Sequence, residues 1–366
     1  MDIMNRVFEH GGTIFAVARE LGISPGELLD FSASINPLGP PPGVWPAIEE
    51  AFSWVGHYPD TACTGLRLLL AEKLGVAPEQ LVVGNGSTEL IHLIPRQGRF
   101  SRKRALLVAP TFSEYGHGLE LAGWSFDYLF LSPGDGFALE LSRVEERLGG
   151  GYDLLYLCNP GNPTGRLYSR DEVGALLGLC REAGTFCVLD EAFMDFCEDG
   201  AALPLLARND GFLILRSMTK FYGFPGIRLG YALGSGKIIA ELERLRPPWS
   251  VGTLAQAAGM AALADRGHGE NTVALVTAER GRLAEGLAGM PGVKVYPGAA
   301  NYLLGELTCG GTAGELARRL LGRRILIRDC SNFPGLNGRF FRVAVRGAVE
   351  NGLLLEGIAA TLPLLS

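Results

Sequence analysis

A lysine and an aspartate, 30 residues apart in the chain (220 − 190), are the two side chains best placed for chemistry. Asp190 follows the apolar run Phe186–Leu189, and Lys220 follows the apolar run Phe212–Leu215. A buried amine has a lowered pKa and can attack an aldehyde. The spacing alone does not distinguish such a lysine from an ordinary lysine in an exposed loop. A carboxylate at the tip of an apolar strand is costly unless it is paired. The partner of Asp190 is therefore a metal ion or a cationic group such as a pyridinium N–H.

Three further segments offer contacts to a ligand. The segment Gly84–Glu89 follows an apolar run and opens a helical pattern, where free N–H groups suit a phosphate, although an ordinary capped turn looks the same. The segment Cys158–Gly165 contains two successive Asn-Pro turns, which hold Asn162 on a rigid backbone or simply form a tight turn. Arg228 either forks onto a phosphate or is an ordinary surface arginine.

Short apolar runs alternate with helical patterns from about residue 81 to residue 234. Continuous apolar runs are typical of strands that are buried on both faces, and their alternation with helices predicts a mostly parallel sheet covered on both sides. The expected strands are Leu81–Val83, Ala105–Val108, Leu154–Cys158, Phe186–Leu189 and Phe212–Leu215, and the expected helices are Ile14–Leu21, Ser87–Ile94 and Asp171–Ala183. Ligands bind such sheets at the carboxyl ends of the strands, where the residues named above lie.

The pattern changes after Pro291. A long helical segment, Leu254–Ala288, is expected to break near Gly267–Gly269. Beyond it we expect the strands Val293–Tyr296, Asn301–Leu304, Ile325–Ile327 and Phe340–Val345, and the helices Ala313–Leu321 and Val349–Leu362. The sequence thus predicts an α/β fold with a large domain at residues 56–265 and a smaller α+β domain at 266–366. Residues 1–55 are expected to pack on the smaller domain.

The composition excludes several classes of protein. The chain has 366 residues, 47% of them hydrophobic, and a net charge of −6, so neither a disordered chain nor a basic nucleic-acid-binding surface is expected. Its seven cysteines form no C-x-x-C pair, and its histidines lack metal-ligand spacing, which argues against a disulfide framework and a metal site. Apolar runs too short to span a bilayer and a non-apolar start at Met1–His10 lead us to expect a cytoplasmic location.

Taken in their order and spacing, these segments resemble the fold-type I enzymes that use pyridoxal 5′-phosphate (PLP). The resemblance implies that Lys220 bonds to the coenzyme aldehyde, Asp190 pairs with the pyridine nitrogen and Asn162 contacts O3′. It also implies that Tyr115, in the segment Pro110–Tyr115, stacks on the ring. Tyr58 would reach the phosphate in the neighbouring subunit, which implies a homodimer. The residues implied to hold the phosphate within one subunit are Gly86, Ser87, Thr88, Ser217 and Arg228.

Within that group the chain is similar to histidinol-phosphate aminotransferases and, more closely, to threonine-phosphate decarboxylases. The segments Leu28–Gly39, Ile325–Cys330 and Phe341–Arg346 carry the second likeness, together with Phe193 where the aminotransferases usually have a tyrosine. This implies decarboxylation of O-phospho-L-threonine to (R)-1-amino-2-propanol O-2-phosphate and CO₂, for cobalamin biosynthesis. The residues implied to contact this small phosphorylated amino acid are His10, Gly11, Ser34, Asn162, Arg328 and Arg342.

Alternatives remain at the level of sequence. Ser34 stands where the decarboxylases have an asparagine, so O-phospho-L-serine, which would yield ethanolamine phosphate, is an alternative substrate. A histidinol-phosphate-type aminotransferase is an alternative activity, because no residue type distinguishes loss of carboxylate from loss of the Cα proton. Two arginines suit a dianion plus a carboxylate, but the assignment of Arg328 and Arg342 to these two groups is open.

Overall fold

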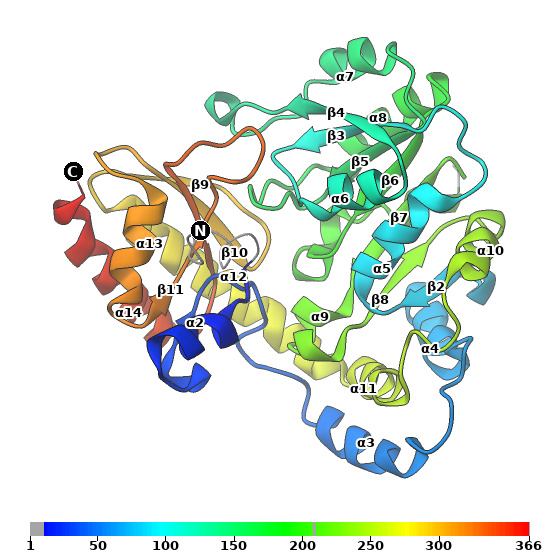
Figure 1. Cartoon of the computed structure of the whole chain (residues 1–366), viewed down its shortest axis with the longest axis horizontal. Coiled ribbons are helices and arrows are strands. Elements are labelled where there is room, and N and C mark those ends of the chain that lie inside the picture. Colours follow the sequence, from blue (N-terminus) through cyan, green and yellow to red (C-terminus); the bar gives the residue numbers. More distant parts are fainter. Residues whose placement is uncertain (1–10, 208–209, 366) are drawn as a thin grey trace.

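The large sheet of the protein contains seven strands in the spatial order β2-β8-β7-β6-β5-β3-β4 (Figure 1). The computed structural model describes residues 11–207 and 210–365. The strands are β2 (Leu81–Gly84), β3 (Arg104–Ala109), β4 (Ser125–Phe130), β5 (Leu154–Cys158), β6 (Phe186–Asp190), β7 (Phe212–Ser217) and β8 (Gly230–Leu233). Strand β8 is antiparallel to both of its neighbours, and every other pair in this sheet is parallel. The mostly parallel sheet inferred from the sequence is thus confirmed.

Both faces of this sheet are buried, as the continuous apolar runs predicted. Along β5, Leu155 and Leu157 belong to one apolar core, while Leu154 and Tyr156 belong to a second core on the opposite face. This division follows from the period of two in a strand. The helices of this part of the chain are α4 (Thr64–Leu74), α5 (Gly86–Leu93), α6 (Glu114–Leu121), α7 (Leu141–Leu148), α8 (Arg170–Glu182), α9 (Met218–Phe221), α10 (Gly236–Leu245) and α11 (Thr253–Ala264).

A second, antiparallel sheet has the strand order β12-β13-β10-β9. Its strands are β9 (Val293–Tyr296), β10 (Tyr302–Leu307), β12 (Arg328–Asp329) and β13 (Phe340–Ala344), and helices α13 (Ala313–Leu321) and α14 (Ala348–Thr361) accompany it. The 23-residue helix α12 (Arg266–Ala288) contacts β9, β10 and α14 and lies between the two halves of the molecule in Figure 1.

The N-terminal segment contacts both halves. Strand β1 (Leu29–Asp30), which follows helix α2 (Ile14–Leu21), pairs in parallel with β11 (Ile325–Leu326) next to the small sheet. Helix α3 (Val44–Ala51) packs instead against α11, on the side of the large sheet. The chain between them therefore crosses from one half to the other, and it passes the carboxyl ends of the large sheet on the way, where the Asn36 N–H donates to the Lys220 carbonyl at 3.0 Å.

The expected break in the long helical segment was wrongly placed. The chain breaks at Asp265, and Gly267–Gly269 lie inside the first turn of α12. The Asp265 side chain accepts a hydrogen bond from the His268 N–H at 2.9 Å and so caps the new helix. Among the described helices none is long and apolar enough to cross a bilayer.

Candidate active site

A cavity of about 650 Å³ opens at the carboxyl ends of the large-sheet strands, against the small sheet. It brings together most of the residues singled out from the sequence: Gly11, Ser34, Ser87, Thr88, Tyr115, Asn162, Asp190, Lys220, Arg228, Arg328 and Arg342. Gly86 and Ser217 do not line this cavity, but they contact residues that do. Tyr58 lies outside it in this chain, and His10 lies outside the described residues.

Lys220 is on the one-turn helix α9, directly after β7. Its Nζ donates a hydrogen bond to Ser217 Oγ at 3.1 Å and lies 5.8 Å from the centre of the Phe193 ring. The pKa of Lys220 is lowered to about 8, mainly by burial; the charge of Asp190 opposes this shift, and the nearby Arg228 adds to it. A neutral, nucleophilic amine is therefore available near neutral pH.

Asp190 is the last residue of β6 and is buried. Its Oδ1 accepts the Ala192 N–H at 2.9 Å, and its Oδ2 accepts the Tyr115 hydroxyl at 2.6 Å. Burial raises the pKa of Asp190, while the Tyr115 hydrogen bond, the charge of Lys220 and the Ala192 N–H lower it. The hydrogen bond to Tyr115 was not anticipated, because the sequence suggested only a stacking role. In the structure the Tyr115 ring stacks on Tyr156, with ring centroids 4.9 Å apart.

A cradle for an anion lies at the start of helix α5. Gly86 has a positive φ of 76°, and a Cβ there would lie 2.8 Å from Nη2 of Arg228, so the arginine packs directly over the helix start. Ser87 and Thr88 of the first turn line the cavity. Helical N–H groups, hydroxyls and a guanidinium together have the chemistry that suits a phosphate.

Two arginines enter the cavity from the small sheet. Arg342 of β13 donates from Nη1 to Asn162 Oδ1 and from Nη2 to the Ser32 carbonyl at 3.0 Å. Arg328 of β12 donates to Asn332 Oδ1 at 2.7 Å and packs over the Phe333 ring. Arg342 therefore lies next to the large-sheet residue Asn162, while Arg328 is held by the loop that follows β12.

Several cavity residues were missed by sequence reasoning. Asp30, Ser32 and Thr111 line the cavity but carry no motif of their own. Within the described residues, the buried Thr111 Oγ1 and Ser34 Oγ have no hydrogen-bond partner. A position directly after strand β3 is the only signal that pointed toward Thr111.

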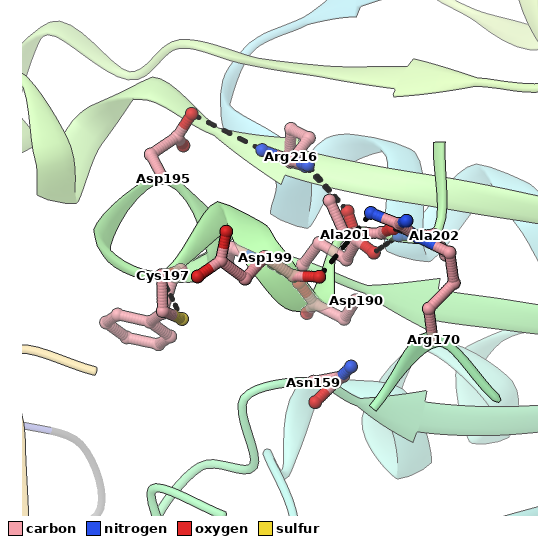
Figure 2. Close-up of polar contacts among 12 residues, drawn as sticks. Asn159, Arg170, Asp190, Asp195, Cys197, Asp199, Ala201, Ala202 and Arg216 are labelled. Carbon is pink, nitrogen blue, oxygen red and sulfur yellow. Dashed lines mark hydrogen bonds and ion pairs between the residues drawn. The ribbon is translucent and has the colours of Figure 1, made fainter. Parts of the chain in front are cut away.

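A buried ion-pair network lies close to Asp190 (Figure 2). Glu191 and Arg216, which directly follow Asp190 and precede Ser217, form an ion pair at 2.8 Å with 0% and 3% of their side chains exposed. Arg216 also pairs with Asp195 at 3.3 Å, and Glu191 Oε1 accepts the Ala202 N–H at 2.7 Å. The network joins the ends of β6 and β7, and so helps to fix the spacing between Asp190 and the segment that carries Lys220.

Tyr58 is 79% exposed and stacks on Trp249, with ring centroids 4.3 Å apart. The chain around it exposes further large apolar side chains: Trp45, Phe52, Trp54, Val55, Leu68 and Leu69. Exposed apolar groups in this number are typical of a protein-protein contact surface.

A mixed, mostly parallel sheet with a half-buried lysine, a buried acid and an anion cradle at its carboxyl edge is the arrangement of the fold-type I transferases. The chain belongs to the aminotransferase class I and II family, whose sequence pattern matches residues 26–360. Over 351 residues it is 41% identical to the threonine-phosphate decarboxylase of Salmonella typhimurium, covering 95% of each protein.

Solved structures agree with this fold. The crystal structure of L-threonine-O-3-phosphate decarboxylase from Porphyromonas gingivalis superposes with a TM-score of 0.80 at 25% identity, covering 92% of this chain and 100% of that one. Histidinol-phosphate aminotransferase from Sinorhizobium meliloti, solved in complex with pyridoxal 5′-phosphate, has a TM-score of 0.86 at 23% identity and covers 96% of this chain and 95% of its own. The family uses PLP.

The cavity of this chain fits that coenzyme. The neutralisable amine of Lys220 suits an aldehyde, the carboxylate of Asp190 suits a protonated pyridine nitrogen, and the cradle at Gly86 and Arg228 suits a phosphate. Within the described residues no group of three histidine, cysteine or acidic side chains is placed to hold a metal ion. Of the two partners that the sequence allowed for Asp190, a pyridinium N–H is the one that the coenzyme of this family supplies.

Proposed function

We propose that this protein is a PLP-dependent decarboxylase that converts O-phospho-L-threonine to (R)-1-amino-2-propanol O-2-phosphate and CO₂ in cobalamin biosynthesis. The observation that carries the proposal is the 41% identity, over nearly the whole chain, to a threonine-phosphate decarboxylase. The structure supports it, because Arg328 and Arg342 line the same cavity as Lys220. A substrate with a phosphate and a carboxylate needs two such cations.

In this proposal the coenzyme contacts within one subunit come from segments next to the ends of the large-sheet strands. Lys220 bonds to the aldehyde, Asp190 keeps the pyridine nitrogen protonated, and Asn162 contacts O3′. Ser87, Thr88 and Arg228 bind the phosphate, with Gly86 and Ser217 beside them. Tyr115 contributes its ring and, through its hydroxyl, supports Asp190. Bound PLP would act as the electron sink for the bond that breaks at Cα.

The two arginines have separate places along the substrate. Arg342 lies against Asn162, close to the coenzyme-binding residues, so it binds the substrate group attached nearest Cα, which is the carboxylate. Arg328 lies at the loop that contains Asn332 and binds the phosphate at the far end. Gly11 and Ser34, with His10, complete this subsite. Lys220 Nζ would hold a proton and donate it to Cα after CO₂ has left.

A single incubation tests the reaction. The holoenzyme is given O-phospho-L-threonine without any 2-oxo acid, and CO₂ and the amine phosphate are measured. CO₂ release supports the proposal, and release that favours O-phospho-L-serine would change the substrate to the smaller one. Amino-group exchange with 2-oxoglutarate and no CO₂ would make the protein an aminotransferase instead.

We also propose a homodimer in which Tyr58 of each subunit completes the phosphate site of the other. The exposed apolar side chains near Tyr58 support such a contact. Complementation tests it: Lys220→Ala and Tyr58→Phe subunits are each impaired, but mixed dimers contain one site with both native residues. Activity that reappears on mixing supports the shared site, and a monomer in solution refutes it.

The same proposal extends to the domains. Residues 56–265 would form the coenzyme-binding domain and residues 266–366 the smaller domain, each containing one of the two sheets. Of the N-terminal segment, β1 lies on the smaller domain, whereas α3 packs on the larger one, which corrects the expectation that all of residues 1–55 pack on the smaller domain. Limited proteolysis tests these boundaries, because cleavage near residue 265 should release two compact fragments.

A further inference from the structure

A carboxylate in the substrate half of the cavity has no assigned role. Asp30, at the end of β1, lines the cavity together with Arg328 and Arg342. A negative charge here opposes the binding of an anionic substrate, so its presence requires another explanation. Its hydrogen bonds supply one.

Asp30 organises the turn that follows it. Its Oδ1 accepts three hydrogen bonds, from the Ser32 N–H at 2.8 Å, the Ser32 hydroxyl at 2.6 Å and the Ala33 N–H at 3.3 Å. This is a side chain closing a turn over its own backbone. The main chain of residues 30–33 is therefore shaped by one carboxylate oxygen.

The same turn holds Arg342, which lies next to the coenzyme-binding residues. The Ser32 carbonyl accepts a hydrogen bond from Arg342 Nη2 at 3.0 Å, across 310 residues of sequence. Arg342 Nη1 donates to Asn162, which leaves Nε buried and without a partner among the described residues. Two of the three guanidinium nitrogens are thus held by hydrogen bonds, and one of these two bonds is made to the turn. Because the guanidinium is planar, these bonds fix the orientation of the whole group.

The same turn also receives the N-terminal segment. The Ser32 hydroxyl gives its hydrogen to Asp30 and accepts the Gly12 N–H at 3.1 Å. A Cβ at Gly11 would lie 2.1 Å from the Ser32 carbonyl oxygen, so only glycine allows this approach. Two residues further on, the buried Ser34 Oγ lines the cavity without a partner in the described part of the chain.

We propose that Asp30 is the positioning residue of the substrate subsite: it closes the turn that places Arg342, Gly11 and Ser34 around the substrate anion. Its oxygen atom matters as a hydrogen-bond acceptor, and its charge is a cost. This inference rests on the proposed function for the identity of the substrate. It does not require that Asp30 touch the substrate.

Two substitutions separate the acceptor from the charge. Asp30→Ala leaves three donors unpaired and frees the turn, so the apparent dissociation constant for O-phospho-L-threonine should rise roughly 10- to 100-fold. Asp30→Asn keeps an oxygen acceptor and removes the charge, so binding should stay at the wild-type level or become tighter. The absorbance of the coenzyme bound without substrate should change little in either variant.

Asp153→Ala is the matched control. Asp153 likewise accepts backbone N–H groups, those of Arg102 and Lys103 at 2.6 and 2.8 Å, but it does not line the cavity. It should lower stability without changing substrate affinity. If Asp30→Ala does not fold, Ser32→Ala serves in its place, because it removes the bond to Gly12 while leaving the Asp30 bonds to the backbone; it should weaken substrate binding to a smaller extent.

The readout is the stopped-flow absorbance change of the bound coenzyme when O-phospho-L-threonine is added, which reports binding whether or not CO₂ is released. A wild-type protein that binds this compound without releasing CO₂ would overturn the proposed function while leaving the role of Asp30 measurable. Unchanged affinity in Asp30→Ala, or in Ser32→Ala if it replaces that variant, would overturn the inference. Asp30→Asn that binds as weakly as Asp30→Ala would also overturn it, because the charge and not the turn would then matter.

Discussion

Removal of one hydroxyl, in Tyr115→Phe, tests how Asp190 is kept charged. The substitution deletes the 2.6 Å hydrogen bond to Asp190 Oδ2 and leaves the ring stacked on Tyr156. A hydrogen bond to a charged group contributes about 1.5–3 kcal/mol. Since one pKa unit corresponds to about 1.4 kcal/mol, the pKa of Asp190 should rise by about one to two.

The consequence is a weaker hold on the coenzyme. Asp190 is charged only above its pKa, so a higher pKa means that the charge is lost at a higher pH. The acid side of the pH profile of PLP affinity should move upward by about one to two pH units, so on that side the affinity at a given pH should fall about tenfold or more. Titration of the apoprotein with PLP, followed by absorbance across pH, measures both.

Tyr156→Phe is the control for this experiment. It makes the same chemical change in the adjoining ring, but the buried Tyr156 hydroxyl has no hydrogen-bond partner in the described part of the chain. Its removal should leave PLP affinity unchanged and stability unchanged or slightly improved. If Tyr115→Phe also leaves the pH profile unchanged, or if both variants shift it equally, the reasoning about Asp190 is refuted.

Three further outcomes are expected. The rate at which the apoprotein captures PLP should rise with pH to a half-maximum near pH 8, because only the neutral amine attacks an aldehyde and the pKa of Lys220 is about 8. Stopped-flow absorbance measures this rate. A half-maximum near pH 10 would contradict the prediction. Arg216→Met should lower the free energy of unfolding, measured by urea denaturation, by about 3–5 kcal/mol, because it leaves the buried Glu191 carboxylate without its cation. Adding Glu191→Gln should restore most of this loss. A loss below about 1 kcal/mol in Arg216→Met would contradict the prediction. Phe193→Tyr should place a donor near O3′ and lower the pH midpoint of the bound coenzyme's absorbance, and an unmoved midpoint would show that its hydroxyl does not reach that oxygen.

The parts of the fold that follow from local pattern were predictable. Strand β5 has the bounds Leu154–Cys158 expected from its apolar run, because a continuous apolar run this short is typical of a strand buried on both faces and is too short for most helices. Strand β4 was missed, since it is only partly buried and its polar Ser125 and Asp127 interrupt the run. The helix break was expected at the glycines Gly267–Gly269, but it lies at Asp265, whose side chain caps the start of helix α12.

The candidate site divides in the same way. Lys220, Asp190 and Asn162 follow strands, so the position of each along the chain already placed them at one edge of the sheet. Asp30 and Ser32 escaped notice because their contact with Arg342 joins residues 310 positions apart. No local pattern encodes such a contact, and it forms only when the N-terminal segment lies against strand β13 of the small sheet.

The cavity is built from two sheets, and this has a consequence for how new specificity can arise. Lys220 and Asp190 lie at the ends of large-sheet strands, whereas Arg328 and Arg342, the cations proposed to bind the substrate, belong to the small sheet. Exchange of strands β12 and β13 with those of a relative should therefore change which amino acid is accepted while preserving the reactivity of the coenzyme. Chimeric proteins joined near Asp265 are a practical route to catalysts for other amine products.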